Sequence, residues 1–316
     1  MKKQKAGFSN WCKTYNGQKY LTSVLFLFIP VVLLVVFTFI PAVQLIPFSL
    51  QDRGQLSVGD QIKFVGLDNY KTVFTDPSYL ETFKISLYYL VGSFVQQIIA
   101  LIIATILCSK IRFKNFFKGV IFFPYLMNGV AVAIIFARFF RTDAISGQGG
   151  LNTILFDMFG IDPINWLSGS PALANWCLVF VSLWRYIGYD ILMYIGAISS
   201  ISTDLYEAAD LDGANPWKRF WYIVFPSIKP IISLQLILAV KGAISVFEVP
   251  YIMTSGRNHT GTFVMKTVDT MFKDDHVGIA SAMAIILLAI TIIVTVIQKA
   301  VFKEETEDKP KKSKRK

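Results

Sequence analysis

The sequence has 316 residues, of which 54% are apolar and only 16% charged, and it contains 27 Phe. Soluble domains carry about 25% charged residues, so this composition excludes an ordinary soluble enzyme and, for most of the chain, disorder. The formal net charge of +10 then indicates a membrane protein with basic flanks and not a nucleic-acid-binding protein. Three Cys and two His are too few for a disulfide framework or a His/Cys metal cage, so we expect no metal site.

Six apolar stretches are long enough to cross a lipid bilayer, which takes about 20 mostly apolar residues in a helix. The first runs from Leu21 to Pro47 without a charge and is too long for a cleavable signal peptide. The sequence therefore predicts an all-α, polytopic membrane helix bundle with six transmembrane helices. The predicted spans cover residues 21–47, 83–108, 118–140, 173–199, 224–252 and 278–302.

The distribution of Lys and Arg predicts the orientation of these spans. If the N-terminus is cytoplasmic, the inner segments carry roughly twice as many basic residues as the outer ones, in line with the positive-inside rule. We therefore expect both termini in the cytoplasm, with residues 1–20 as an N-terminal segment and 303–316 as a basic tail near anionic membrane lipid. Residues 21–302 form the predicted membrane domain, and its core covers about residues 83–302.

The segment between the fourth and fifth spans, DLYEAADLDGANPWKRFWYIVFPSIKP, predicts two short helices joined by a tight turn. Asp204 and Glu207 lie three residues apart, a spacing at which they can cap the start of a helix reciprocally. Gly213 suits the left-handed residue that ends this helix, and Asn215 before Pro216 is a start signal for the next. Two further prolines predict a kink at the entry to the fifth span; they are Pro226 and Pro230.

This loop resembles the EAA motif of ATP-binding-cassette (ABC) importer permeases, with Glu-Ala-Ala, Asp-Gly-Ala and then Phe, Ile and Pro in order. In that family the loop, here residues 204–226, is a coupling helix that docks on an ATPase subunit. The small Ala side chains allow another protein to approach its backbone closely. The resemblance implies docking through Glu207, Ala208, Ala209, Asp212, Gly213 and Ala214, with Phe220, Ile223 and Pro226 completing the motif.

Two other segments resemble the sugar branch of that family, of the maltose-permease-like, first-subunit type. One is F-x-G-L-x-N-Y at residues 64–70, after the first span, and the other is Gly150-Leu151-Asn152 in an outer region. The likeness covers roughly residues 20–302. It implies the permease subunit of an ATP-driven carbohydrate importer that accepts solute from an extracytoplasmic binding protein.

No phosphate loop G-x-x-x-x-G-K-[ST], no G-x-S-x-G elbow and no H-E-x-x-H motif occurs, so the sequence offers no catalytic, cofactor-binding or metal-binding residues. We expect a transport subunit and not an enzyme. The family resemblance implies that ATP and Mg bind to a partner ATPase, present as two subunits. It also implies a second permease subunit as heterodimer partner, and a place in the bacterial cytoplasmic (inner) membrane.

Polar residues inside the spans are candidates for a solute path, because a polar group in lipid is costly. The spacing of Lys241, Ser245 and Glu248 places them on one face of a continuous helix. Aromatic rings suit the apolar faces of a sugar ring and polar groups suit its hydroxyls. We therefore predict a path lined by Tyr186, Tyr189, Asp190, Tyr194, Lys241, Ser245 and Glu248. Other polar residues in the spans are Gln96, Gln97, Asn128, Arg185 and Gln235.

Several alternatives stay open at this point. Lys241 could simply pair with Asp190 or Glu248 to lower the cost of burial. The solute could be something other than a sugar, such as glycerol phosphate, a polyamine or an amino acid, although the acidic residues in the spans offset Lys241 and Arg185 and so favour a neutral solute. An ion-coupled secondary carrier would leave the EAA-like loop unexplained, and an integral membrane enzyme lacks a nucleophile with its base.

Overall fold

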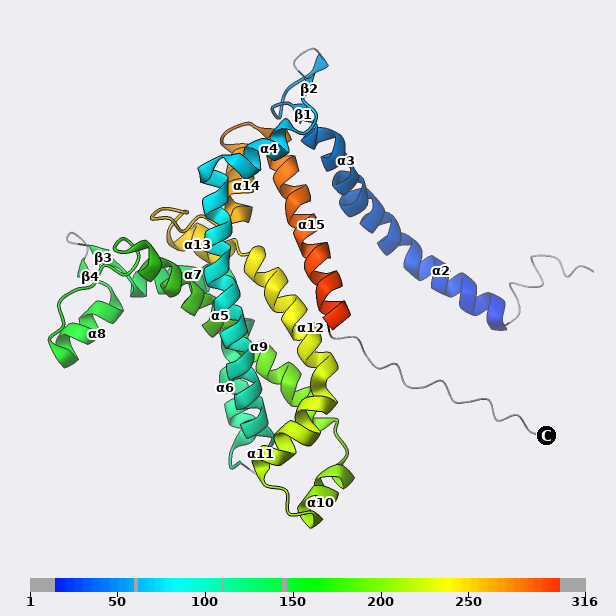
Figure 1. Cartoon of the computed structure of the whole chain (residues 1–316), viewed down its shortest axis with the longest axis vertical. Helices are drawn as coiled ribbons and strands as arrows, with labels where there is room; N and C mark the ends of the chain where they lie inside the picture. Colours follow the sequence, from blue (N-terminus) through cyan, green and yellow to red (C-terminus); the bar gives the residue numbers. More distant parts are fainter. Residues whose placement is uncertain (1–14, 60–61, 110, 144–146, 302–316) are drawn as a thin grey trace, which may run out of the picture.

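The computed structural model describes residues 15–59, 62–109, 111–143 and 147–301. Helices make up almost all of its regular structure, and the described strands form two short antiparallel pairs (Figure 1). The predicted all-α membrane bundle is confirmed. Most of the predicted N-terminal segment, residues 1–14, and the predicted tail 303–316 lie outside the described residues.

Five helical segments are long and apolar enough to cross a membrane, and they agree with five of the predicted spans. The first comprises α2 (Tyr15–Leu34), the π-helical η1 (Val35–Phe39) and α3 (Ile40–Ser49). Three more are α5 (Pro77–Cys108), α9 (Pro171–Ser199) and α15 (Val277–Val301). The remaining one comprises α11 (Pro216–Arg219), the π-helical η3 (Phe220–Val224), α12 (Phe225–Ile244) and α13 (Glu248–Met253).

The predicted third span, residues 118–140, is not one straight helix. The chain bends by 93° between α6 (Lys114–Leu126) and α7 (Gly129–Phe139), and only the two together are long and apolar enough to count as a sixth span. Asn128 starts α7 in the new direction, because its side-chain Oδ1 accepts hydrogen bonds from the N–H groups of Val130 (2.9 Å) and Ala131 (3.3 Å). The sequence marked Asn128 only as a polar residue in the third predicted span, and the structure shows that the span bends there.

Helix α9 lies at the centre of the bundle and packs along α5, α6 and α12. Two glycines allow close approach of these helices. A Cβ on Gly188 would collide with the backbone of Ile121 in α6, and a Cβ on Gly92 in α5 would collide with the side chain of Val179. Small residues at these crossings therefore set how closely α5 and α6 sit against α9.

Two large apolar clusters fill the bundle at different levels. One is built from α5, α7, α9 and α13, with Ile85, Val132, Leu178 and Val249 among its buried members. The other, which we call the lower core, is built from α5, α9, η3 and α12. Its buried members are Ala100, Ala104, Leu107, Ile191, Tyr194, Ile195, Ile198, Val224, Ile228 and Ile232.

Short elements cap the end of the bundle opposite α10 (Thr203–Leu211) (Figure 1). The hairpin of β1 (Gln51–Asp52) and β2 (Lys63–Phe64) leads into α4 (Asp68–Thr75), and α14 (Phe263–Phe272) lies nearby. Asn69 ties the hairpin down by donating to the carbonyl oxygens of Ser49 (2.8 Å) and Gln51 (2.9 Å).

A second small unit consists of β3 (Thr142–Asp143), β4 (Gly147–Gln148) and α8 (Gly150–Phe159). Asn152 organises it: its Oδ1 accepts hydrogen bonds from the Ile164 N–H (3.1 Å) and the Trp166 indole (2.8 Å).

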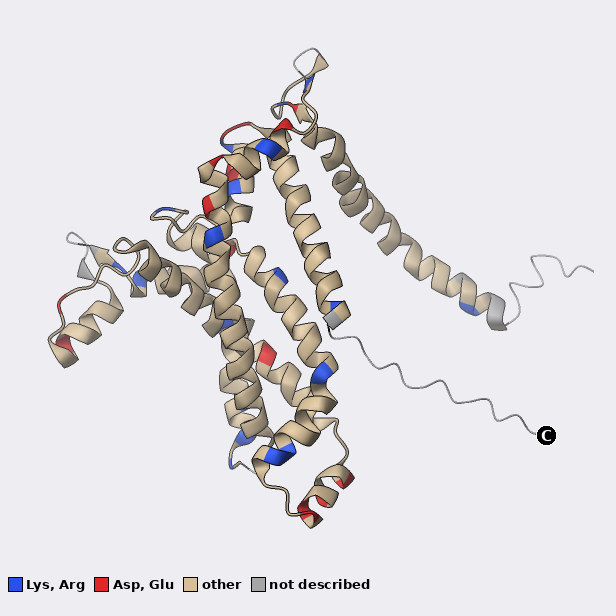
Figure 2. Ribbon diagram, in the orientation of Figure 1, with Lys and Arg blue, Asp and Glu red and all other residues tan. Residues whose placement is uncertain are grey.

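The first span diverges from the other helices, so that α2 lies far from the bundle (Figure 1). α3 packs against α15, but no residue in the most apolar stretch of the span is buried within this chain. Charged residues gather near the two ends of the helical bundle, and the lengths between them are mostly uncharged (Figure 2). This distribution is the one expected for helices that cross a hydrocarbon layer.

Candidate functional site

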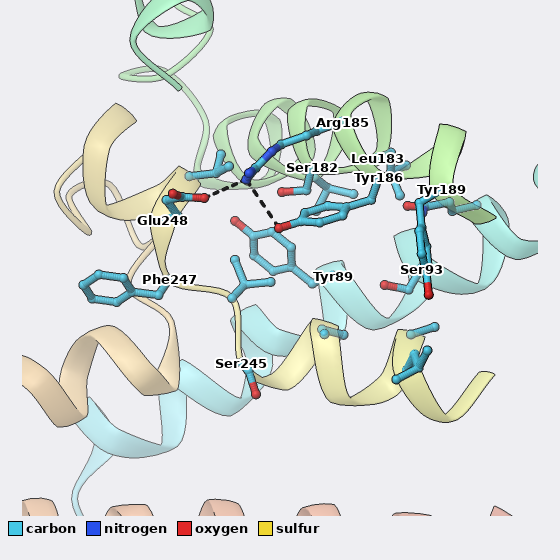
Figure 3. Close-up of a pocket in the computed structure, with 18 of the residues that line it drawn as sticks. Tyr89, Ser93, Ser182, Leu183, Arg185, Tyr186, Tyr189, Ser245, Phe247 and Glu248 are labelled. Carbon is cyan, nitrogen blue, oxygen red and sulfur yellow. Dashed lines mark hydrogen bonds and ion pairs between the residues drawn. The ribbon is translucent and has the colours of Figure 1, made fainter. Parts of the chain in front are cut away.

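A cavity of about 780 Å³ lies between α5, α7, α9, α12 and α13 (Figure 3). Aromatic and aliphatic side chains form most of its wall, and a few polar groups point into the same space. Such a mixture is typical of small-molecule sites, in which apolar surface supplies contact area and polar groups fix orientation.

A charge pair closes one side of this cavity. The guanidinium Nη1 of Arg185 lies 2.6 Å from Oε2 of Glu248, and the same nitrogen donates to the hydroxyl of Tyr186 at 3.3 Å (Figure 3). The side chain of Arg185 is 14% exposed and that of Glu248 is 41% exposed. Gly129, at the start of α7, leaves room for the pair, since a Cβ there would collide with both side chains. The two charges therefore compensate each other within the cavity wall.

Tyrosine rings form another part of the wall. Tyr189 stacks on Tyr125 of α6 with ring centroids 5.1 Å apart, and Tyr186 meets Tyr125 edge-on at 6.1 Å. On α13, Tyr251 stacks on Phe247 at 4.8 Å. Tyr89 also lines the cavity, and its buried hydroxyl has no hydrogen-bond partner among the described residues.

A buried carboxylate lies at one end of the cavity. Oδ2 of Asp190 accepts hydrogen bonds from the side-chain amides of Gln96 (2.5 Å) and Gln97 (3.0 Å), and Oδ1 accepts one from Gln235 (2.8 Å). The Tyr194 hydroxyl donates to Oε1 of Gln97 at 2.7 Å. We call these five residues the Asp190 network. It joins α5, α9 and α12 through neutral donors.

The structure brings together five of the seven predicted path residues. Tyr186, Tyr189, Asp190, Ser245 and Glu248 line the cavity. Tyr194 does not line it, because its ring is buried in the lower core.

Lys241 also lies outside the lining, and its side chain is exposed. The expected continuous face through Lys241, Ser245 and Glu248 was wrong, since α12 ends at Ile244 and Glu248 begins a separate helix. The alternative pairing of Lys241 was wrong too, because Glu248 pairs with Arg185 and Asp190 with three glutamines.

Several lining residues were missing from the predicted path. Arg185 stood out in the sequence as a charge within a span, and its pairing with Glu248 makes it part of the site. Tyr89, Ser93 and Phe247 gave no such signal, because aromatic and hydroxyl side chains are common in membrane helices. Only the packing of α5 and α13 against α9 places them at the cavity.

The segment between the fourth and fifth predicted spans forms a helical knob, residues 203–219, at one end of the molecule (Figure 1). Ser202 caps α10 by accepting a hydrogen bond from the Asp204 N–H at 3.3 Å, so the predicted Asp204–Glu207 cap was wrong. Gly213 has φ of +67°, and Asn215 accepts from the Lys218 N–H at 2.8 Å, as predicted. Instead of a simple proline kink, the chain makes the π-helical turn η3 just before Pro226.

The knob is internally braced. Arg219 forms an ion pair with Asp210, and its Nε donates to the carbonyl oxygen of Ala214 at 2.9 Å. Tyr206 packs against the lower core, and burial raises the pKa of its phenol. A movement of α10 would therefore act on the bundle through a packed contact.

The predicted docking residues differ in their exposure. Glu207, Ala208, Asp212 and Gly213 are exposed, whereas Ala209 is buried and Ala214 half-buried. Leu211, which is 89% exposed, was not predicted as a docking residue but offers apolar surface beside them. Acidic residues gather on α10 (Figure 2). The docking role itself stays a prediction.

Among the described residues, no group of three or more His, Cys, Asp or Glu side chains could hold a metal ion. His259 forms a pair with Glu81, and both side chains are largely exposed.

A membrane-spanning bundle with a cavity of this chemistry and a protruding helical knob defines a subunit of a solute transporter. The chain belongs to the family described as binding-protein-dependent transport system inner membrane component, whose model matches residues 96–304. The predicted resemblance to ABC importer permeases is thereby confirmed, as is a multi-pass protein of the inner membrane.

The alignments with two similar proteins cover most of the chain. The probable ABC transporter permease protein YurN of Bacillus subtilis is 32% identical over 252 residues, which span 78% of this chain and 84% of that protein. The multiple sugar-binding transport system permease protein MsmF of Streptococcus mutans is 30% identical over 278 residues, or 86% of this chain and 92% of that protein.

Two solved structures share the fold. One is a bacterial ABC transporter involved in the import of the acidic polysaccharide alginate, with a TM-score of 0.76 at 19% identity, covering 92% of this chain and 99% of that chain. The other is a bacterial alginate ABC transporter in complex with an alginate pentasaccharide-bound periplasmic protein, with a TM-score of 0.78 at 18% identity, 94% of this chain and 99% of that chain.

Proposed function

We propose that this chain is the permease subunit of an ATP-driven importer for a carbohydrate. The cavity carries the proposal, because it combines tyrosine rings with hydroxyl and amide groups and a charge pair that compensates itself. Aromatic faces suit the apolar faces of a sugar ring, and polar groups suit its hydroxyls. Relatives named for sugars support this class: MsmF, and the arabinooligosaccharides transport system permease protein AraP of Bacillus subtilis, 30% identical over 75% of each chain.

Solute contacts are assigned to the residues that line the cavity and lie away from the Asp190 network. These are Tyr186, Tyr189, Ser245 and Glu248, to which the geometry adds Arg185 and Tyr89. Tyr89 is included because its ring lines the cavity. Lys241 and Tyr194 are left out, since neither lines the cavity.

The working complex in this proposal contains a second permease subunit as heterodimer partner, two ATPase subunits that bind ATP and Mg, and an extracytoplasmic binding protein. The exposed surface of the helical knob supports docking of an ATPase, because four of the six predicted docking residues are accessible there. The unburied apolar stretch of the first span supports contact with another membrane subunit or lipid. Both termini and the helical knob face the cytoplasm.

A permease for a non-sugar solute is the second candidate. A strongly anionic solute such as glycerol phosphate is disfavoured, because the cation lining the cavity, Arg185, is already paired with Glu248. An ion-coupled carrier is disfavoured by membership of a binding-protein-dependent family.

Co-purification of the tagged chain from its own membrane tests the assembly. We expect an ATPase and a second permease to accompany it, and ATP hydrolysis to be stimulated by the binding protein with its sugar. Gly213→Pro should abolish this stimulation, because Pro cannot adopt φ of +67° and lacks the N–H that donates to the Asp210 carbonyl at 3.1 Å.

Gly213→Ala is the matched control, since Ala adopts the left-handed conformation at a cost of about 1–2 kcal/mol. A chain that purifies without an ATPase would overturn the proposal. Screening the co-purified binding protein against neutral and charged sugars then separates the sugar class from the non-sugar alternative.

A further inference from the structure

We propose that a second cavity, away from the helical knob, binds the phosphate group of an anionic membrane phospholipid. This cavity has a volume of about 560 Å³, and three arginines lie in its wall: Arg138, Arg141 and Arg257. We call it the arginine cavity. The inference goes beyond the proposed function, because it does not depend on which solute is transported.

The arginine cavity adjoins the first cavity, which is drawn in Figure 3, and Ile252 lines both. Its wall is built where three predicted spans end away from the helical knob. Residues 138–142 follow the span 118–140, residues 167 and 168 precede the span 173–199, and residues 253–258 follow the span 224–252. Lipid phosphates lie at this level, where helices leave the hydrocarbon layer. In the proposed orientation of the chain, this is the outer leaflet.

The wall carries positive charge that is not balanced within it. Among the described residues, no Asp or Glu lines the arginine cavity. Arg138 and Arg257 are exposed and form no ion pair with a described residue, whereas Arg141 has a partner within the chain. An anion relieves the repulsion between such cations, and the planar guanidinium group matches the oxygens of a phosphate.

Hydrogen bonds hold the arginine cavity in shape without a ligand. Next to Arg257, the side-chain amide of Asn258 donates to the carbonyl oxygens of Leu167 (3.0 Å) and Gly169 (3.2 Å). The hydroxyl of Thr142 donates to a carbonyl oxygen of the loop before α9 at 2.7 Å. A site formed in advance loses less conformational entropy when a ligand binds.

Apolar surface beside the arginines favours a lipid over a free anion. Ile134 lines the cavity and is half exposed, and α8 exposes Met158 (70%) and Phe159 (68%). Asn152 links α8 to the cavity wall by donating to Oγ1 of Thr142 at 3.0 Å. Apolar side chains next to cations are typical of segments that lie on an anionic membrane. A phospholipid satisfies both features, because its phosphate suits the arginines and its acyl chains suit the apolar side chains.

The test measures lipid binding by the complex that purifies with the tagged chain. Phosphatidylglycerol is the probe, since three cations disfavour a headgroup that carries an amine, and phosphatidylcholine is the reference lipid. Native mass spectrometry of the complex in detergent gives the dissociation constant for each lipid. We expect the double variant Arg138→Gln, Arg257→Gln to raise the constant for phosphatidylglycerol at least about tenfold, because each arginine donates charge-assisted hydrogen bonds.

A charge-matched control separates a site from general attraction. Lys71→Gln combined with Lys84→Gln removes the same charge from exposed positions on α4 and α5, outside the arginine cavity, and should bind phosphatidylglycerol like the parent. The single variants Arg138→Gln and Arg257→Gln decide the test if the double variant does not assemble, and each should bind the lipid more weakly than the parent.

Equal affinity for phosphatidylglycerol in the parent and the arginine variants would overturn the lipid site. If stimulation by the binding protein or retention of a second permease falls instead, the arginines meet an acidic group of that protein. Displacement of the lipid by millimolar inorganic phosphate or glucuronate would show a site for a free anion and would also overturn the proposal. A complex that lacks an ATPase but binds the lipid as expected would contradict the proposed function alone.

Discussion

The ring of Tyr189 stacks on Tyr125 and lines the cavity, so it offers a rigid aromatic surface to a solute. We expect Tyr189→Ala to lower uptake about two- to tenfold, since an aromatic contact contributes about 0.5–1.5 kcal/mol. Tyr189→Phe keeps the ring and should lose less. Uptake into membrane vesicles measures the effect, and co-purified ATPase should stay constant. Equal uptake by the parent and the Ala variant would remove Tyr189 from the path.

The Arg185–Glu248 pair is asymmetric, because Arg185 is 14% exposed and Glu248 is 41% exposed. Glu248→Ala leaves a nearly buried guanidinium without its carboxylate, whereas Arg185→Ala leaves a carboxylate that solvent reaches. We expect Glu248→Ala to destabilise the protein by about 1–3 kcal/mol, and Arg185→Ala by less. Thermal unfolding of the purified complex measures both variants, and the reverse order would contradict this view of the pair.

At the scale of elements, the crossing of α6 and α9 depends on Gly188. A Cβ there would collide with the Ile121 carbonyl, so Gly188→Ala should cost about 1–3 kcal/mol through overpacking. Gly196→Ala is a matched control on the same helix, because no atom lies within 4 Å of the added Cβ. There the change should be neutral or stabilising by up to about 1 kcal/mol. The midpoint of thermal unfolding should fall in Gly188→Ala and stay the same or rise in Gly196→Ala. An equal midpoint in the two variants would contradict this view of the crossing.

At the scale of the whole molecule, the lower core lies between the helical knob and the Asp190 network. Ile228 is 1% exposed at its centre. Ile228→Ala should cost about 2–5 kcal/mol of stability, because it leaves a cavity in the lower core. It should also reduce the amount of solute transported per ATP, because a movement of the helical knob would reach the solute cavity through this core. Ile293→Ala, at a 56% exposed position of α15, should change neither. Uptake and ATP hydrolysis measured together provide the ratio, and an unchanged ratio in Ile228→Ala would show that coupling bypasses this core.

Much of this protein could be predicted from its sequence. The spans follow from the length of apolar runs, because lipid demands about 20 apolar residues whatever their neighbours are. The turn at Gly213 and the cap at Asn215 were predictable because both depend on the local backbone. Family membership followed from the same loop.

The tertiary structure decided which polar groups meet. The pairing of Arg185 on α9 with Glu248 on α13 depends on packing between helices, which residue spacing within one helix does not encode. Asp190 shows this most clearly. The sequence marked it as a charge in a span, but its three amide partners lie on α5 and α12, so only the packing of the bundle could turn a predicted path residue into the centre of a buried network.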